Sequence, residues 1–275
     1  MNELFTLLIH QPVYNLLIVL YRLFSENLGL AIIVIALLSR LILLPLALRQ
    51  NKMMAQNKEF SERIKEIKAK YKNDKVKQQE EMMKAQSEFM PAQLAGCLPL
   101  ILQFILLITI NNVFSQLFID GISSFSRYAY SFVPTFPEGY VLNTTFLGIV
   151  DLNVHPNTLE FNAAIIPYLG IILLVGLTQY LSTKFIQPAI HESKKEQDQK
   201  KEKKSKKEEN PTQDFSEVLA QSTKQTMFLF PILIMTAAYS FATGLSLYWI
   251  AQSTFVIIQQ ILLRRLKKSE NIVSK

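Results

Sequence analysis

Residues 28–48 read LGLAIIVIALLSRLILLPLAL and decide the fold, because this apolar run contains a single charged residue, Arg40. A run of about 17–25 apolar residues is long enough to span a bilayer. Four further runs contain no acidic residue: 94–118, 161–183, 227–241 and 245–263. The run 227–241 is short but can be extended by Ala242 and Thr243. The sequence therefore predicts an all-α, polytopic membrane protein with five transmembrane helices.

The distribution of positive charge predicts the topology. Most of the 29 Lys and Arg residues lie in three segments, with 11 in 49–90, ten in 184–226 and five in 264–275. Loops rich in Lys and Arg remain mainly on the cytoplasmic side of a membrane. We therefore expect a multi-pass plasma membrane protein with its N-terminus outside, an external loop at 119–160 and its C-terminus in the cytoplasm.

The segment 1–27 is predicted to form an external helix that lies in the membrane interface. After Pro12, apolar residues share one helical face, whereas Asn15, Arg22 and Glu26 share the other. This amphipathic pattern is typical of interfacial helices. A sixth transmembrane span is the alternative.

The cytoplasmic segments differ in composition. Residues 49–90 contain two charged stretches with apolar stripes, Ile64, Ile67 and Tyr71 in the first and Met82, Met83 and Phe89 in the second, separated by a turn at Lys72-Asn73-Asp74. This pattern predicts a helical hairpin, with a solvated linker as the alternative. Within the basic loop 184–226, residues 193–210 carry eight Lys, five acids and no apolar residue, which predicts disorder. Residues 264–275 are predicted to be a basic cytoplasmic tail.

The residues with catalytic or metal-binding chemistry are few. Cys97 is the only cysteine, and His10, His155 and His191 lie in three different segments. The sequence therefore cannot form a disulfide within the chain, and it has no spacing typical of a Cys/His metal site. It also lacks a glycine-rich phosphate loop and the usual nucleophile motifs. We expect no enzymatic activity, no catalytic residue, no metal and no cofactor.

Arg40 is the most informative residue, because an arginine near the centre of a membrane helix costs roughly 2.5–3.5 kcal/mol. Snorkelling of its long side chain toward the cytoplasmic headgroups is one explanation. However, Gly29, Ala36 and Ala47 share the face of Arg40, and small residues mark the packed face of a membrane helix. This pattern favours an arginine that points into the bundle.

Other polar residues in the spans are candidate neighbours of Arg40. The last span carries Ser246, Trp249, Ser253 and Gln260 on one face and Gln252 at its edge, the third span carries Gln179, and the second carries Gln103. Such residues often serve only to hydrogen-bond one helix to another. Together with Arg40 they predict a hydrated cavity in the inner half of the membrane. No acid in these runs neutralises Arg40, which favours a substrate carboxylate as its partner.

Several stretches, ordered along nearly the whole chain, carry a resemblance to a known family: 27–33 leading to Arg40 and Pro45, 71–74, 78–83, 94–99, 146–148, 177–181, 244–250 and 257–260. In these stretches the sequence resembles the YidC family of membrane protein insertases, with relatives in mitochondria and chloroplasts. The resemblance implies a groove that is open to cytoplasm and lipid and closed outside, with Arg40, Gln179 and Trp249 as groove residues.

The resemblance also implies partners. These are nascent membrane protein clients, the lipid bilayer, the ribosome through the basic loop and tail, and the Sec translocon and signal recognition machinery, with the hairpin as a mobile recruiting element. No large external domain and no lipoprotein cysteine occur near residue 1, which predicts the core-only form. The lysine-rich stretch 193–210 departs from the family pattern.

Two functions of different classes fit these residues. The first is a non-enzymatic insertase and chaperone that moves hydrophobic segments of clients into the bilayer through a hydrophilic groove containing Arg40. The alternative is an anion-binding solute transporter or channel. The spans contain no internal repeat and no matching pair of interrupted helices, which disfavours the transporter.

Overall fold

The computed structural model describes residues 3–119, 128–133, 136–137, 139–186 and 215–273. Within these ranges, the side chains of 47, 49–59, 61, 89–101, 186, 215–227 and 267–273 are not described. The stretch 193–210 and most of the predicted basic loop therefore lie outside the described residues, as do the side chains of Cys97 and Phe89.

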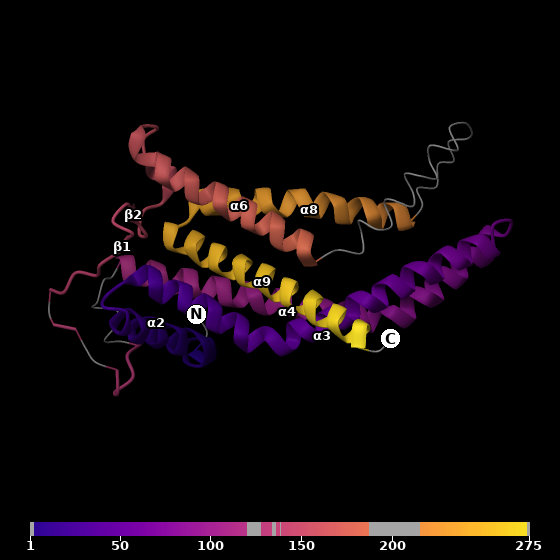
Figure 1. The fold of residues 1–275 in the computed structure, drawn as a ribbon, viewed down its shortest axis with the longest axis horizontal. Coiled ribbons are helices and arrows are strands. Elements are labelled where there is room, and N and C mark those ends of the chain that lie inside the picture. Colours follow the sequence, from indigo (N-terminus) through magenta and orange to yellow (C-terminus); the bar gives the residue numbers. More distant parts are fainter. Residues whose placement is uncertain (1–2, 120–127, 134–135, 138, 187–214, 274–275) are drawn as a thin grey trace. The chain divides into compact units, whose positions relative to one another are not determined.

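Helices dominate the described chain (Figure 1). They are α1 (Glu3–Phe5), the π-helical turn η1 (Thr6–His10), α2 (Gln11–Leu23), α3 (Leu28–Lys70), α4 (Lys75–Ile119), α6 (Ile166–Ile186), α8 (Phe215–Ser240) and α9 (Thr243–Val273). Between α4 and α6 lie two short strands, β1 (Thr145–Phe146) and β2 (Val150–Asp151), and the 3-10 turns η2 (Pro156–Thr158) and η3 (Ala163–Ile165).

Five helical segments are long and apolar enough to cross a membrane: Glu3–Leu23, Leu28–Leu46, Leu102–Ile119, Ala163–Phe185 and Thr243–Leu266. The predicted class, an all-α polytopic membrane protein with five candidate spans, is therefore confirmed. The set of five differs from the predicted set. The segment before Leu28 qualifies as a span, whereas the apolar part of α8, Phe228–Ser240, is shorter than a full span.

The N-terminal helix continues past Pro12, which lacks the N–H of a regular helical turn. The preceding turn, η1, is a wider π-turn in which the Gln11 N–H donates to the Thr6 carbonyl oxygen. A π-turn shifts the hydrogen-bond pattern by one residue, so the helix passes the proline without a break.

The predicted water-facing side of this helix is wrong. Asn15 is only 3% exposed, and its side chain donates to the Tyr128 carbonyl oxygen at 2.7 Å and accepts from the Tyr130 N–H at 2.8 Å. The exposed side is instead apolar and includes Leu16, Val19 and Leu23. The helical pattern places Asn15 on the solvated side because its backbone partners, Tyr128 and Tyr130, are distant in sequence.

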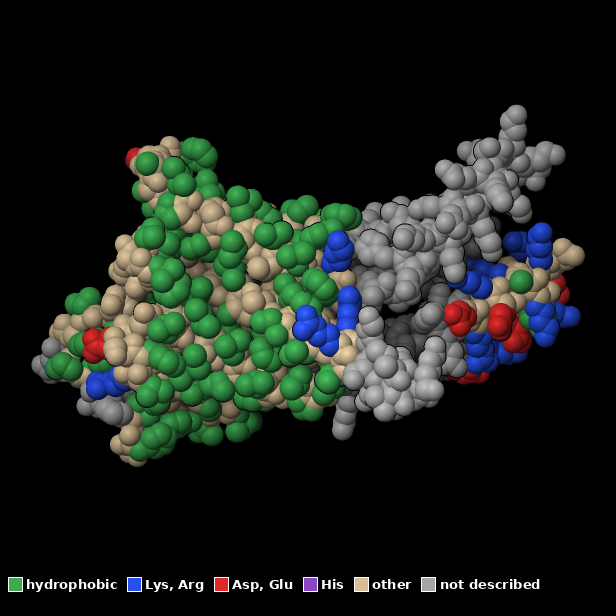
Figure 2. All heavy atoms as spheres, in the orientation of Figure 1, with side chains coloured by type: hydrophobic (Ala, Val, Ile, Leu, Met, Phe, Trp, Pro, Cys, Tyr) green, Lys and Arg blue, Asp and Glu red, His purple; other side chains and the backbone are tan. Residues whose placement is uncertain are grey.

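The chain forms two compact units, of which the larger comprises 1–41, 104–186 and 227–275. We call this unit the bundle. Its core is a single cluster of buried side chains contributed by its helices, among them Tyr14, Ile32, Phe114, Val175 and Tyr248. Within it α6 and α9 lie side by side (Figure 1). The visible face of the bundle is covered mainly by hydrophobic side chains, as Figure 2 shows.

The second unit comprises 42–103 and 187–226 and contains the turn between α3 and α4. We call the part from Phe60 to Glu88 the hairpin. Its small core is formed by Phe60, Ile64 and Ala85, with Ile67 and Met82 packed against them. The turn is closed by the Asp74 carboxylate, which accepts from the Lys77 N–H at 3.0 Å and so caps α4.

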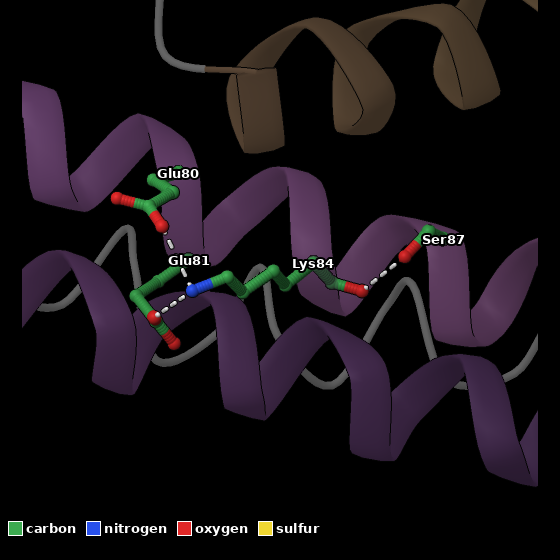
Figure 3. A network of polar contacts seen from close by, with 4 residues as sticks. All are labelled: Glu80, Glu81, Lys84 and Ser87. Carbon is green, nitrogen blue, oxygen red and sulfur yellow. Dashed lines mark hydrogen bonds and ion pairs between the residues drawn. The ribbon is translucent and has the colours of Figure 1, made fainter.

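The surface of the hairpin is charged, in contrast to that of the bundle (Figure 2). Lys84 pairs with Glu80 at 2.9 Å and with Glu81 at 3.1 Å on α4 (Figure 3). Arg63 on α3 pairs with Glu88 on α4 at 2.9 Å. Met83 is 62% exposed, so its predicted place in the apolar stripe is wrong.

Candidate functional site

Arg40 lies on the packed face of α3, in the second half of the candidate span Leu28–Leu46. Gly29 and Ala36 on the same face are buried, as the pattern of small residues predicts. The Arg40 side chain is half-buried, and its Nη2 donates to Oε1 of Gln252 on α9 at 3.4 Å. The guanidinium is thus directed toward a neighbouring helix of the bundle.

Gln252 is the centre of this polar cluster. Its Nε2 donates to the Ser39 hydroxyl at 3.1 Å and to the Tyr248 hydroxyl one turn earlier on α9. Because both amide hydrogens have acceptors, the Gln252 carbonyl oxygen is left to face Arg40. Ser39 in turn donates to the Ala36 carbonyl oxygen at 2.7 Å. The cluster therefore fixes the orientation of the group that contacts the guanidinium.

A second polar contact joins α6 to α9. The Ser253 hydroxyl donates to Oε1 of Gln179 at 3.0 Å. The hydroxyls of Ser182 and Thr183 both donate to the Gln179 backbone carbonyl at 2.9 Å. Because Ser253 follows Gln252 directly, one turn of α9 supplies polar contacts to both α3 and α6.

The other predicted site residues occupy different positions. Trp249 and Ser246 are buried on α9, and the Ser246 hydroxyl has no hydrogen-bond partner among the described residues. Gln260 is half-buried two turns beyond Ser253. Gln103 is half-buried on α4 and belongs to the second unit.

Sequence reasoning missed two members of the cluster, Ser39 and Tyr248. Ser39 directly precedes Arg40, and Tyr248 lies four residues before Gln252 on α9. The spacing from Tyr248 to Gln252 places both on one helical face and is a signal that the sequence does contain. The pairing of Ser39 with Gln252 across two helices depends on the tertiary structure.

The hydrogen bonds of Arg40 leave most of its capacity unused. A guanidinium has five N–H donors, and a bond of 3.4 Å is long and therefore weak. Arg40 Nε is buried without a hydrogen-bond partner, and no carboxylate pairs with the guanidinium in the part of the chain that the structure describes. Burying a charged group without a full set of hydrogen bonds costs free energy.

Comparison with known proteins identifies the family to which the chain belongs. The family model described as 60Kd inner membrane protein matches residues 19–271. This match covers most of the chain, including Arg40 and the contacts of α9 with α3 and α6. The chain belongs to the 60Kd inner membrane protein family, which confirms the resemblance to YidC proteins.

Several curated relatives carry the description membrane protein insertase YidC. The chain is 27% identical over 277 aligned residues to the protein of Caulobacter vibrioides, covering 96% of this chain but only 38% of that relative. It is 25% identical to the protein of Fusobacterium nucleatum, covering 85% of this chain and 84% of the relative. For the Leptospira interrogans protein the identity is 25%, over 91% of this chain and 33% of the relative. The chain thus spans well under half the length of the first of these relatives.

Proposed function

We propose that this protein is a membrane protein insertase and chaperone that moves hydrophobic client segments from the cytoplasm into the bilayer. The observation that carries the proposal is the cluster of half-buried Arg40 and buried Gln252 among the mainly apolar helices of the bundle. Membership of the 60Kd inner membrane protein family, and the printed description of its relatives as insertases, support the same function.

The proposed groove contains residues of the bundle alone: Arg40, Gln179, Ser246, Trp249, Gln252, Ser253 and Gln260. The polar side chains shelter the hydrophilic tail of a client while its apolar segment contacts lipid. An acidic tail gains on the order of 4 kcal/mol from Arg40 at 4 Å and an effective dielectric of 20. Water in the groove lowers this gain, but the sign of the interaction remains.

Two physical terms drive insertion without a nucleotide. Transfer of the client segment into lipid contributes about 0.8 kcal/mol for each buried CH₂ group. Outward movement of an acidic tail contributes about 2.3 kcal/mol per elementary charge per 100 mV of membrane potential. Arg40 acts by lowering the cost of bringing the tail into the membrane before these terms apply.

The proposed orientation places the N-terminus outside and the C-terminus in the cytoplasm, because the basic segments 49–90, 184–226 and 264–275 then lie inside. In this orientation the hairpin faces the cytoplasm and recruits clients. The basic segments are proposed contacts for the anionic RNA of the ribosome. The Sec translocon and the signal recognition machinery are further proposed partners.

The experiment that tests the function uses the purified full chain in proteoliposomes without other proteins. A radiolabelled single-span client with a short outer tail is added, and external protease then digests every segment that has not been inserted. We expect a larger amount of protected client fragment with the protein than with empty liposomes. Equal protection in the two preparations would contradict an insertase. Uptake of small radiolabelled anions without client protection would favour the transporter.

A further inference from the structure

A short β-hairpin, formed by β1 and β2, lies between α4 and α6 in the chain (Figure 1). Its turn exposes apolar side chains. β1 and β2 pair antiparallel, with Phe146 opposite Val150. The turn is closed by the Ile149 N–H, which donates to the Phe146 carbonyl oxygen at 3.2 Å. Leu147 and Ile149 at the tip are 75% and 70% exposed. We call these two residues the tip.

The base of this β-hairpin is attached to the ends of three candidate spans. The Phe146 ring lies against Gly29, the second residue of the span Leu28–Leu46. The Leu152 carbonyl oxygen accepts from the Gly244 N–H at 2.9 Å, at the start of the span Thr243–Leu266. The Asp151 N–H donates to the Tyr168 hydroxyl at 3.3 Å, within the first turns of the span Ala163–Phe185.

These attachments place the tip close to the membrane surface. Leu147 lies four positions before Asp151 in the chain. Four steps span at most about 13 Å, at roughly 3.3 Å per residue. The headgroup layer on each side of the hydrocarbon core is itself about 5–8 Å thick. The tip is therefore within reach of the lipid layer that surrounds the span ends.

The backbone at the tip adopts a conformation that leucine disfavours. Leu147 has φ of 54° and Gly148 has φ of 70°. Glycine adopts positive φ freely, but a bulky side chain does so rarely. A two-residue turn of this kind prefers Asn-Gly. The exposed Leu147 side chain contributes little packing to offset this backbone cost.

We propose that the tip inserts into the lipid leaflet on its side of the membrane and anchors the β-hairpin there. Two further large apolar side chains near the start of α6, Phe161 and Ile166, are also exposed, at 90% and 64%. Residues 139–166 contain no Lys or Arg, so the anchor is apolar rather than electrostatic. The anchor holds the segment after α4 against the ends of the three spans.

The test uses spin labels on the full chain, in nanodiscs that hold one copy each. Single cysteines replace Leu147 or Ile149 in a Cys97→Ala background, and Asn157→Cys, an exposed residue of η2, is the matched control. Collisions of the label with oxygen report lipid, and collisions with a water-soluble nickel chelate report water. We expect oxygen to dominate at both tip positions and the nickel chelate to dominate at position 157, with no change when the salt concentration rises.

Nickel access at the tip equal to that at position 157 would overturn the proposal. Protection that appears only with several copies in one disc would indicate contact between copies, and would also overturn it. A second variant, Leu147→Asn, preserves the turn because Asn-Gly suits it. We expect this variant to move a label at position 149 toward water. An unchanged signal would show that protein, and not lipid, covers the tip.

Discussion

The bundle and the hairpin share the same two long helices, α3 and α4, but are stabilised in different ways. In the bundle these helices contribute to an extended buried core, with polar side chains such as Ser39 and Gln252 hydrogen-bonded inside it. In the hairpin they enclose only a small cluster around Ile64 and carry ion pairs on the surface. One continuous helix therefore contributes to an extended buried core in one part and to a small core with a charged surface in the other. The side chains, and not the backbone, determine this difference.

The largest expected difference comes from the same truncation made in each region. Ile110 in the bundle is 2% exposed and Ile64 in the hairpin is 3% exposed. Ile110→Ala should cost about 2–5 kcal/mol, because it leaves a cavity in a packed core. It should lower the unfolding temperature of the whole protein in detergent.

Ile64→Ala should instead act locally. We expect faster hydrogen exchange in the hairpin amides and unchanged exchange in the bundle amides, because the small hairpin core opens independently. The wild-type hairpin should already exchange faster than the membrane helices. Equal protection of the hairpin and the bundle in the wild-type protein would remove the basis of the comparison.

The next prediction tests how tightly the bundle packs at Gly29. A Cβ at this position overlaps the Phe146 ring, so Gly29→Ala should destabilise the bundle by about 1–3 kcal/mol. Gly170→Ala on α6 is the matched control, because a Cβ there meets nothing within 4 Å. The double variant Gly29→Ala/Phe146→Ala should cost less than the two single changes combined. Strict additivity in thermal unfolding would contradict the contact.

Sequence patterns predicted the apolar spans well, because hydropathy depends on composition alone. They placed a boundary near residue 48, whereas α3 continues without a break to Lys70. A change from apolar to charged residues alters the environment of a helix but does not end it. The direction of Asn15 and the central role of Gln252 could not be predicted, because both depend on partners distant in sequence.

An effect of similar size on stability is expected from the polar cluster. Gln252→Leu removes one hydrogen-bond partner each of Ser39, Tyr248 and Arg40, and losing a partner of a buried polar group costs about 1–3 kcal/mol. Thr254→Ala on the exposed side of α9 is the control. We expect a lower unfolding temperature and weaker client insertion for Gln252→Leu alone. Equal behaviour of the two variants would show that the cluster is dispensable.

The smallest effect is expected on the hairpin surface. The hydrogen bond and charge of Lys84 lower the pKa of the Glu80 carboxyl below its ordinary value, and Glu80 and Glu81 raise the pKa of Lys84 (Figure 3). Because the pKa of Glu80 is lowered on folding, its contribution to stability is present above the unfolded pKa, near 4.3, and is lost as the pH falls through the folded pKa.

Lys84→Gln should therefore raise the pKa of Glu80 toward its ordinary value in a titration followed by NMR. Lys77→Gln should raise it less, because Lys77 makes the smaller electrostatic contribution. Neither change should measurably alter the unfolding temperature, since exposed ion pairs contribute little. An equal shift in both variants would argue against the contact drawn in Figure 3.

The most direct test of the central claim varies the charge of Arg40 against two clients that differ only in their outer tail, acidic in one and neutral in the other. Insertion into proteoliposomes is measured by protease protection, with Arg265→Ala as a control for a lost exposed charge. For the acidic client we expect Arg40→Lys to retain much of the activity, because the charge persists. Arg40→Ala should lower the activity and Arg40→Glu should lower it further, because the Coulomb attraction disappears and then reverses. The neutral client should change little. Equal impairment of both clients by Arg40→Ala in a folded protein would contradict attraction of acidic tails by Arg40.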